Sequence, residues 1–111
     1  MDILVTMPRG HTTQETGLTK TWWKMGRRPK SLVSGDRVYF IEYGEITFYE
    51  KFTGKLARDP VDYSGRVLVG EHLVLDSKDR RLRGSIRHKG FQGFRYIKPD
   101  SALFRKLRAA E

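Results

Sequence analysis

The sequence predicts a mixed α+β fold, a small five-stranded bent β-barrel with two flanking helices, in a single domain of residues 1–111. Three observations predict it. The run 37–43 is rich in β-branched and aromatic residues and follows a Ser-Gly-Asp turn signal, which is typical of a turn that enters a central strand. Apolar residues occupy both faces of that run, so both faces need a cover. Two further stretches, 18–25 and 102–108, have helical spacing.

The N-terminal third is expected to contain a strand, a loop and a helix. Residues 2–7 form a short apolar run that a proline ends, which predicts the first strand. Residues 8–17 are polar and rich in helix breakers, which predicts a loop. Leu18, Trp22 and Met25 then lie at i, i+4 and i+7, which predicts a helix of about three turns.

The middle of the chain is expected to be mostly strand. Residues 37–43 and 46–56 flank a Tyr-Gly-Glu sequence and are predicted to form a hairpin. The Asp-Pro and Ser-Gly pairs in 57–65 predict a surface loop. Residues 66–76 form a third β segment, and Gly70 within it indicates a bend at a barrel corner.

The C-terminal part is expected to contain the last strand and the second helix. Residues 91–97 combine glycine with aromatic residues and form the end of a basic tract between residues 78 and 98, which predicts the last strand. Asp100 or Ser101 can N-cap the final helix over 102–108.

The composition favours a polyanionic partner. The chain has 22 Lys and Arg against 13 Asp and Glu, a formal charge of +9, so its field attracts nucleic acid, with RNA favoured. The alternative is that the positive excess only aids solubility. There is no cysteine, and the three histidines lack metal-ligand spacing, so we expect neither a metal nor a cofactor. We also expect a cytoplasmic protein without a membrane span, and we favour a monomer as its oligomeric state.

The chain resembles the PUA-like superfamily, and its ASCH and EVE branches most nearly. The resemblance depends on the Gly-Asp-Arg-Val-Tyr-Phe sequence at 35–40, the two tryptophans upstream and the Gly-Phe-Gln-Gly-Phe-Arg-Tyr sequence at 90–96. Trp23 stands where the ASCH helix signature has an acid. The resemblance implies a pseudo-barrel that holds RNA, or a flipped modified base, in a cleft beside the first helix.

Two basic clusters with neighbouring aromatic residues form the predicted binding site, one around the first predicted helix and one in the tract 78–98. Cations contact phosphates and flat rings stack on unpaired bases. Trp23 is the expected exposed ring, because it lies about 100° round the helix from Trp22, which we assign to the core. Arg9 and His11 in the preceding loop are candidates to line a ligand pocket, and the alternative is an ordinary solvated loop. The predicted nucleic-acid-binding residues are Arg9, His11, Lys20, Trp23, Lys24, Arg27, Arg28, Arg83, Arg87, Lys89 and Arg95.

Two other functions stay open. A small metal-independent ribonuclease needs a base for the 2′-hydroxyl and cations for the phosphate, and the candidate catalytic residues are Lys20, Tyr43 and His88. The other alternative is a protein-interaction adaptor whose basic faces meet an acidic partner. The nucleic-acid hypothesis requires that the two basic clusters meet in one hollow with aromatic rings in reach.

Overall fold

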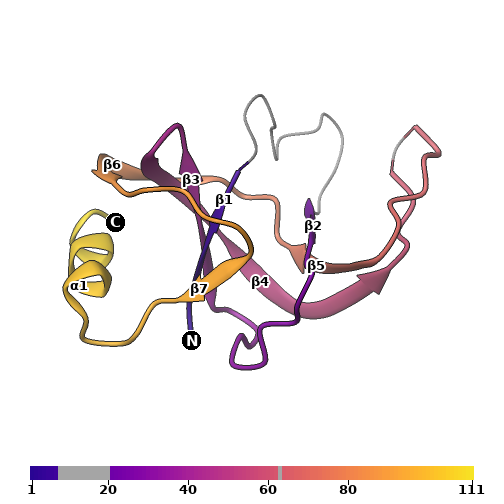
Figure 1. The fold of residues 1–111 in the computed structure, drawn as a ribbon, viewed down its shortest axis with the longest axis horizontal. Coiled ribbons are helices and arrows are strands. Elements are labelled where there is room, and N and C mark those ends of the chain that lie inside the picture. The colour runs from indigo at the N-terminus through magenta and orange to yellow at the C-terminus, as the bar shows by residue number, and fades with distance from the viewer. Residues whose placement is uncertain (8–20, 63) are drawn as a thin grey trace.

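The computed structural model describes residues 1–7, 21–62 and 64–111, and this part of the chain is mostly sheet (Figure 1). It contains seven strands in an open sheet and one short helix, so the predicted five-stranded barrel with two helices is wrong. The elements are β1 (Ile3–Thr6), β2 (Thr21–Lys24), β3 (Arg37–Glu42), β4 (Glu45–Arg58), β5 (Glu71–Leu75), β6 (Arg80–Arg87), β7 (Phe94–Tyr96) and α1 (Ala102–Ala109).

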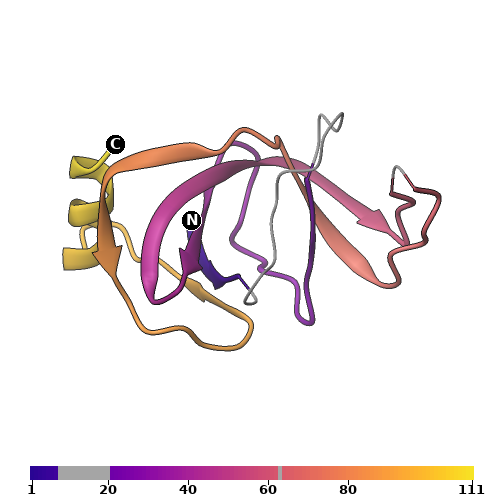
Figure 2. The same ribbon diagram turned by 90° about the horizontal axis from the view of Figure 1, so that it is seen from above.

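The long strand β4 organises the sheet. Its first half pairs with β3 on one edge and with β6 on the other, and its second half pairs with β5. The strand order is β2-β5-β4-β3-β1-β7, with β6 beside β4 off this path. Only β1 and β3 run parallel among these pairs. Figure 2 shows that β4 curves along its length, so the sheet bends around one face.

The predicted first helix is replaced by β2, and Leu18 of that prediction lies outside the described residues. The stretch has β-branched and aromatic residues at Thr21, Trp22 and Trp23, which favour a pleated strand. The strand pairs with β5, where Trp22 faces Val74. Cross-strand pairing therefore overrides the helical spacing of three apolar residues.

The remaining strands and the C-terminal helix agree with the prediction only in part. The β3–β4 hairpin is confirmed, and its Tyr43-Gly44 turn has φ 50° and 77°, the positive pair of a type I′ turn. The third β segment keeps only β5, while Val67 bridges Val61 in an arm that projects beyond the sheet (Figure 1). The strand β6 was not predicted. The last helix is confirmed as α1, with Ser101 as its N-cap.

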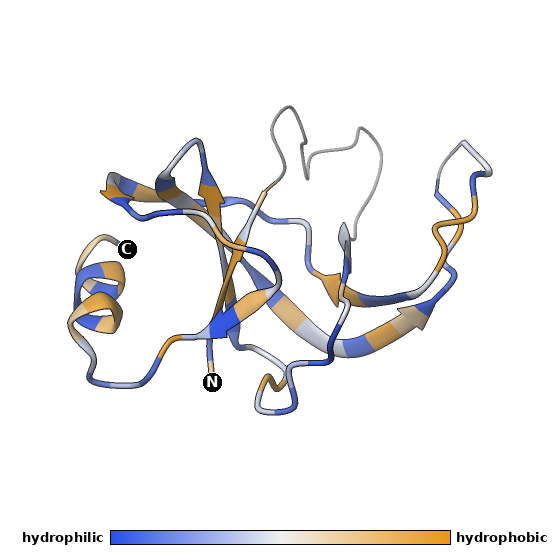
Figure 3. Cartoon of the chain, viewed as in Figure 1, coloured by the Kyte–Doolittle hydropathy of each residue, from blue (hydrophilic) through white to orange (hydrophobic). Residues whose placement is uncertain are grey.

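The sheet is buried on both faces. One cluster, on the concave side, contains Phe40, Phe48 and Leu73, and Trp23 packs against it. The ring centroids of Trp23 and Phe40 are 5.0 Å apart although β5 and β4 separate their strands in the sheet, so the sheet must bend strongly. On the opposite face a second cluster includes Leu107 of α1. Figure 3 shows hydrophobic and hydrophilic residues interspersed along β4 and α1.

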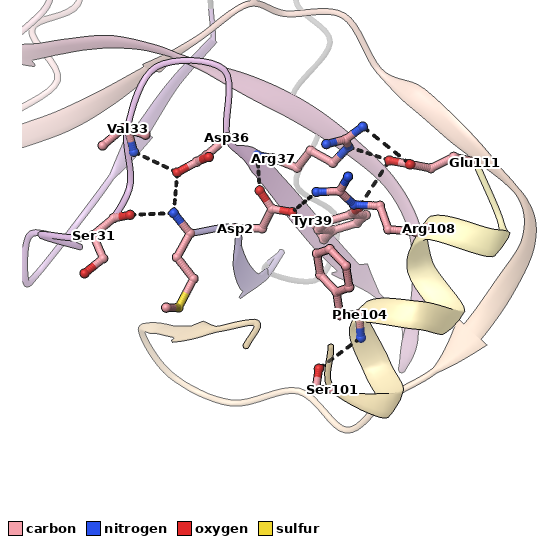
Figure 4. Close-up of polar contacts among 11 residues, drawn as sticks. Asp2, Ser31, Val33, Asp36, Arg37, Tyr39, Ser101, Phe104, Arg108 and Glu111 are labelled. Atoms are coloured by element: carbon pink, nitrogen blue, oxygen red, sulfur yellow. Dashed lines mark hydrogen bonds and ion pairs between the residues drawn. The ribbon is translucent and has the colours of Figure 1, made fainter. Parts of the chain in front are cut away.

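A polar cluster fixes α1 to the start of the sheet (Figure 4). The carboxylate of Asp2 accepts hydrogen bonds from the backbone N–H of Arg37 at 2.8 Å and from the guanidinium of Arg108 at 2.9 Å. Glu111 pairs with Arg37 and accepts from the Tyr39 hydroxyl at 3.2 Å. Burial, with the Glu111 charge in second place, raises the pKa of Tyr39 well above its usual value. No helix in the described part of the chain is long and apolar enough to cross a membrane.

Candidate nucleic-acid interface

The two ends of the strand order, β2 and β7, face each other across a pocket that we call the seam pocket. Among the described residues no strand pairing joins β2 to β7, so the curled sheet leaves an unclosed side. The pocket has a volume of about 500 Å³, within the usual range for ligand sites. It is lined by Thr6, Trp23, Lys24, Met25, Gly26, Arg27, Gln92, Gly93 and Phe94.

Trp23 forms a wall of the seam pocket and is not the exposed ring that the sequence predicts. Its edge meets Phe40 at an interplanar angle of 77°, an arrangement that is favourable for aromatic pairs. Successive side chains alternate across a strand, so Trp22 points to the opposite face, where its register partner is Val74. The helical spacing instead assigned Trp22 to the core and Trp23 to the surface, whereas both rings are half-buried.

A smaller hollow continues the seam pocket. It has a volume of about 290 Å³ and shares Arg27 and Phe94 with the seam pocket. The guanidinium of Arg27 lies 4.9 Å above the Phe94 ring, a cation–π distance. Arg28, Lys30 and Tyr96 complete its lining. None of the lining residues of either hollow is acidic, so the local potential is positive.

The loop 88–93 forms one rim of the seam pocket and is fixed to β1. The Thr6 hydroxyl accepts a hydrogen bond from the backbone N–H of Phe91 at 3.0 Å. A Cβ at Gly90 would lie 3.0 Å from Thr6 Cγ2, so only glycine fits there without displacing its neighbour. The rim residues Gln92 and Gly93 are therefore held beside the end of β1.

A separate hollow, which we call the turn hollow, lies at the β3–β4 turn. Its volume is about 460 Å³. The backbone N–H of His88 donates to the Gly44 carbonyl at 2.9 Å, which fixes the end of β6 against the turn. Two candidate catalytic residues meet here, together with two predicted phosphate contacts. The lining residues are Tyr43, Gly44, Glu45, Arg87, His88 and Lys89.

Among the described residues, Arg83 and Arg95 of the predicted site do not line the seam pocket. The Arg95 guanidinium lies 4.3 Å above the ring of Phe91, which packs with the cluster on the opposite face of the sheet. Arg83 is exposed on β6. Arg9, His11 and Lys20 lie outside the described residues. Lys24 and Arg27 line the seam pocket together with the uncharged Gln92 and Gly93, whereas Arg87 and Lys89 of the tract 78–98 line the turn hollow. The described cations of the two basic clusters therefore do not meet in one hollow, as the sequence-based hypothesis required.

The list of predicted binding residues omits several lining residues, namely Thr6, Gln92, Phe94 and Tyr96, of which Tyr96 was considered only as one of several rings that could stack on bases. A signal for two of them exists in the sequence. Phe94 and Tyr96 alternate with Arg95 in a predicted strand, so they had to share one face. Nothing local indicated that this face would meet β2, because that meeting depends on the bend of the whole sheet.

No known family model matches the chain, and neither does any curated protein or solved structure. The resemblance to the PUA-like superfamily therefore stays a prediction.

Proposed function

We propose that the protein binds nucleic acid at the seam pocket, with single-stranded or modified RNA as the favoured ligand. One observation carries this proposal: an unclosed side of the sheet gathers aromatic rings and cations with no acid among the lining residues. Lys and Arg supply sequence-independent affinity through phosphates. Half-buried rings such as Trp23 and Tyr96 can stack only on bases that are not paired.

Arg27 is the residue on which the proposal depends most. It lines both hollows, is exposed, and already lies over the Phe94 ring. A guanidinium in this position can contact a phosphate with its edge and leave its plane free for a base. The proposal extends to a cytoplasmic, monomeric protein, which the sequence also predicts.

A charge-matched pair of variants tests the proposal. We expect Arg27→Ala to weaken the binding of a fluorescein-labelled, six-nucleotide single-stranded RNA about tenfold at low salt, because it removes a phosphate contact and a stacking surface. Arg105→Ala removes the same charge from an exposed position of α1. The measurement is fluorescence anisotropy at several salt concentrations. Equal effects of the two variants would show that only net charge matters and would contradict the proposed site.

The ribonuclease alternative is favoured by one observation, the meeting of Tyr43 and His88 beside Arg87. In such a reaction a base removes the proton of the 2′-hydroxyl, and the 2′-oxygen attacks phosphorus. The 5′-oxygen then leaves with a proton from an acid, and a 2′,3′-cyclic phosphate forms. RNA incubated with the protein in EDTA should show cyclic ends, which His88→Ala should abolish. Intact RNA after long incubation excludes this alternative.

The adaptor alternative makes a different prediction. A basic surface that serves an acidic protein should bind every oligonucleotide weakly. Under this alternative the affinity for oligonucleotides should not change in Trp23→Ala. Under the proposed function it should fall, because that variant removes one wall of the seam pocket.

A further inference from the structure

We infer that the turn hollow is a second phosphate subsite for the strand that enters the seam pocket, with the loop 88–93 as the path between them. The inference rests on the proposed function and specifies its ligand as a single strand of about four nucleotides or more. Four features of the described residues carry it: the composition of the turn hollow, the exposure of Tyr43, the fixed loop and the distance that the loop can span.

The turn hollow has the composition of an anion site. Arg87 and Lys89 are exposed and line it together with His88, and Glu45 is its one acidic lining residue. The Nδ1 atom of His88 lies 2.9 Å from the Lys89 carbonyl oxygen. A carbonyl accepts, so this nitrogen carries the proton and Nε2 is left for another partner. The surplus of cations over acids favours a phosphodiester over a neutral ligand.

Tyr43 gives the turn hollow a flat surface. Its side chain is 75% exposed and adds nothing to either core cluster. The turn holds it at φ 50°, a backbone conformation that is unfavourable for an aromatic residue. A ring presented to solvent beside two cations is the combination that stacks on bases and tracks the backbone of single strands.

The loop 88–93 keeps the two hollows close together. Lys89 lines the turn hollow and Gln92 lines the seam pocket. Three residues of extended chain span at most about 11 Å, and the Phe91–Thr6 hydrogen bond fixes the loop between them. A stacked strand rises about 3.4 Å per nucleotide, so about four nucleotides reach from one hollow to the other.

A length series tests the inference. The probes are oligouridylates of two, four and six nucleotides, titrated while the indole N–H signal of Trp23 is followed by NMR. In the wild type we expect affinity to rise at least tenfold from two to four nucleotides and little beyond that. The double variant Arg87→Ala/Lys89→Ala should bind the dinucleotide as the wild type does but lose the gain at four.

The control removes the same two charges elsewhere. Arg105→Ala/Lys106→Ala replaces one exposed Arg and one exposed Lys of α1, and we expect it to keep the length dependence. Loss of two phosphate contacts should also reduce the slope of log affinity against log salt by about 1.4 for the Arg87/Lys89 variant.

The outcomes separate the inference from the proposed function. If the dinucleotide binds, Arg27→Ala weakens it and the longer strands gain nothing, the second subsite is overturned and the seam pocket stands. If the Arg105/Lys106 variant loses as much as the Arg87/Lys89 variant, the gain is only electrostatic and the inference is again overturned. If no oligonucleotide of any length binds, the proposed function itself fails.

Discussion

Asp76 shows how one residue holds the junction between β5 and β6. Its carboxylate accepts two hydrogen bonds from Arg80, at 2.8 and 3.2 Å, and one each from the backbone of Lys78 and of Lys51. Burial acts to raise the pKa of Asp76, but these donors outweigh it and lower that pKa below its usual value. The charged carboxylate is therefore the form that the folded state favours.

A substitution at this position should change both stability and its pH dependence. We expect Asp76→Asn to lower the free energy of unfolding at pH 7 by about 1 kcal/mol, since solvent screening limits a partly exposed ion pair. In the wild type the stabilisation from the charged Asp76 carboxylate is complete above the pKa of about 3.9 that aspartate has in the unfolded chain. It is lost as the pH falls through the lower pKa of Asp76 in the folded state.

Urea denaturation at pH 7 and between pH 2 and 4 measures this. The difference between wild type and variant should shrink toward the acid end. A difference that stays constant with pH would show that the Asp76 charge does not matter to folding.

At the same scale, Trp22 and Trp23 show what single residues could reveal beforehand. Helical spacing predicted Trp22 as internal and Trp23 as external, but in the structure both rings are half-buried and it is Trp23 that packs against the core. The difference arises because side chains in a strand return to the same face every two residues, whereas those in a helix do so every 3.6 residues. Lys24 and Arg27 were predicted as nucleic-acid contacts, and both line the seam pocket. Their charged side chains stay at the solvent-exposed surface, because an unpaired charge is costly to bury.

At the scale of elements, the β3–β4 turn combines a strained residue with a favourable geometry. Tyr43 and Gly44 both have positive φ, as a type I′ turn requires, and Asn-Gly is the pair that suits it best. Tyr43 therefore occupies a place where another residue would be more stable.

We expect Tyr43→Asn to raise the free energy of unfolding by up to about 1 kcal/mol, because asparagine tolerates the left-handed conformation better. Tyr43→Ala is the matched control, since it removes the ring and keeps the strain. Thermal denaturation of the three proteins measures the effect. Equal stabilisation by both replacements would show that removing the exposed ring is the cause, and the argument from φ would be wrong.

The elements also differ in how far their sequences reveal them. The hairpin of β3 and β4 was predictable because its turn and both strands are local. The strand β6 was not, since Arg80–Arg87 contains five charged or small polar residues besides one glycine and only two aliphatic residues. It pairs with β4, and the carbonyl of Ala110, the C-cap of α1, accepts a hydrogen bond from the backbone N–H of Arg83 at 2.8 Å.

At the scale of the whole molecule, the charge of +9 sets the response to salt. We expect the logarithm of the affinity for single-stranded RNA to fall linearly with the logarithm of salt, with a slope near −0.7 for each phosphate contacted. Anisotropy titrations between about 50 and 200 mM salt measure it. A flat dependence would exclude phosphate contacts as the main source of binding.

The open side of the sheet was beyond the reach of the sequence. Whether β2 pairs with β7 depends on how far the sheet curls, and that is set by long-range contacts such as Trp23 with Phe40. Alternation and turn signals act over a few residues. They indicated the β3–β4 hairpin and the C-terminal helix, which the structure contains, but they led to a closed five-stranded barrel with two helices, which is wrong.

The pairing of β4 with three neighbouring strands also affects how the protein unfolds. One continuous strand of 14 residues supplies hydrogen-bond partners to β3, β5 and β6. The half of this strand that pairs with β3 and β6 continues directly into the half that pairs with β5, so we expect the two portions of the sheet to open together. Amide protons at both extremities should therefore exchange with deuterium through a common, global opening, and no shorter fragment that divides this strand should fold alone.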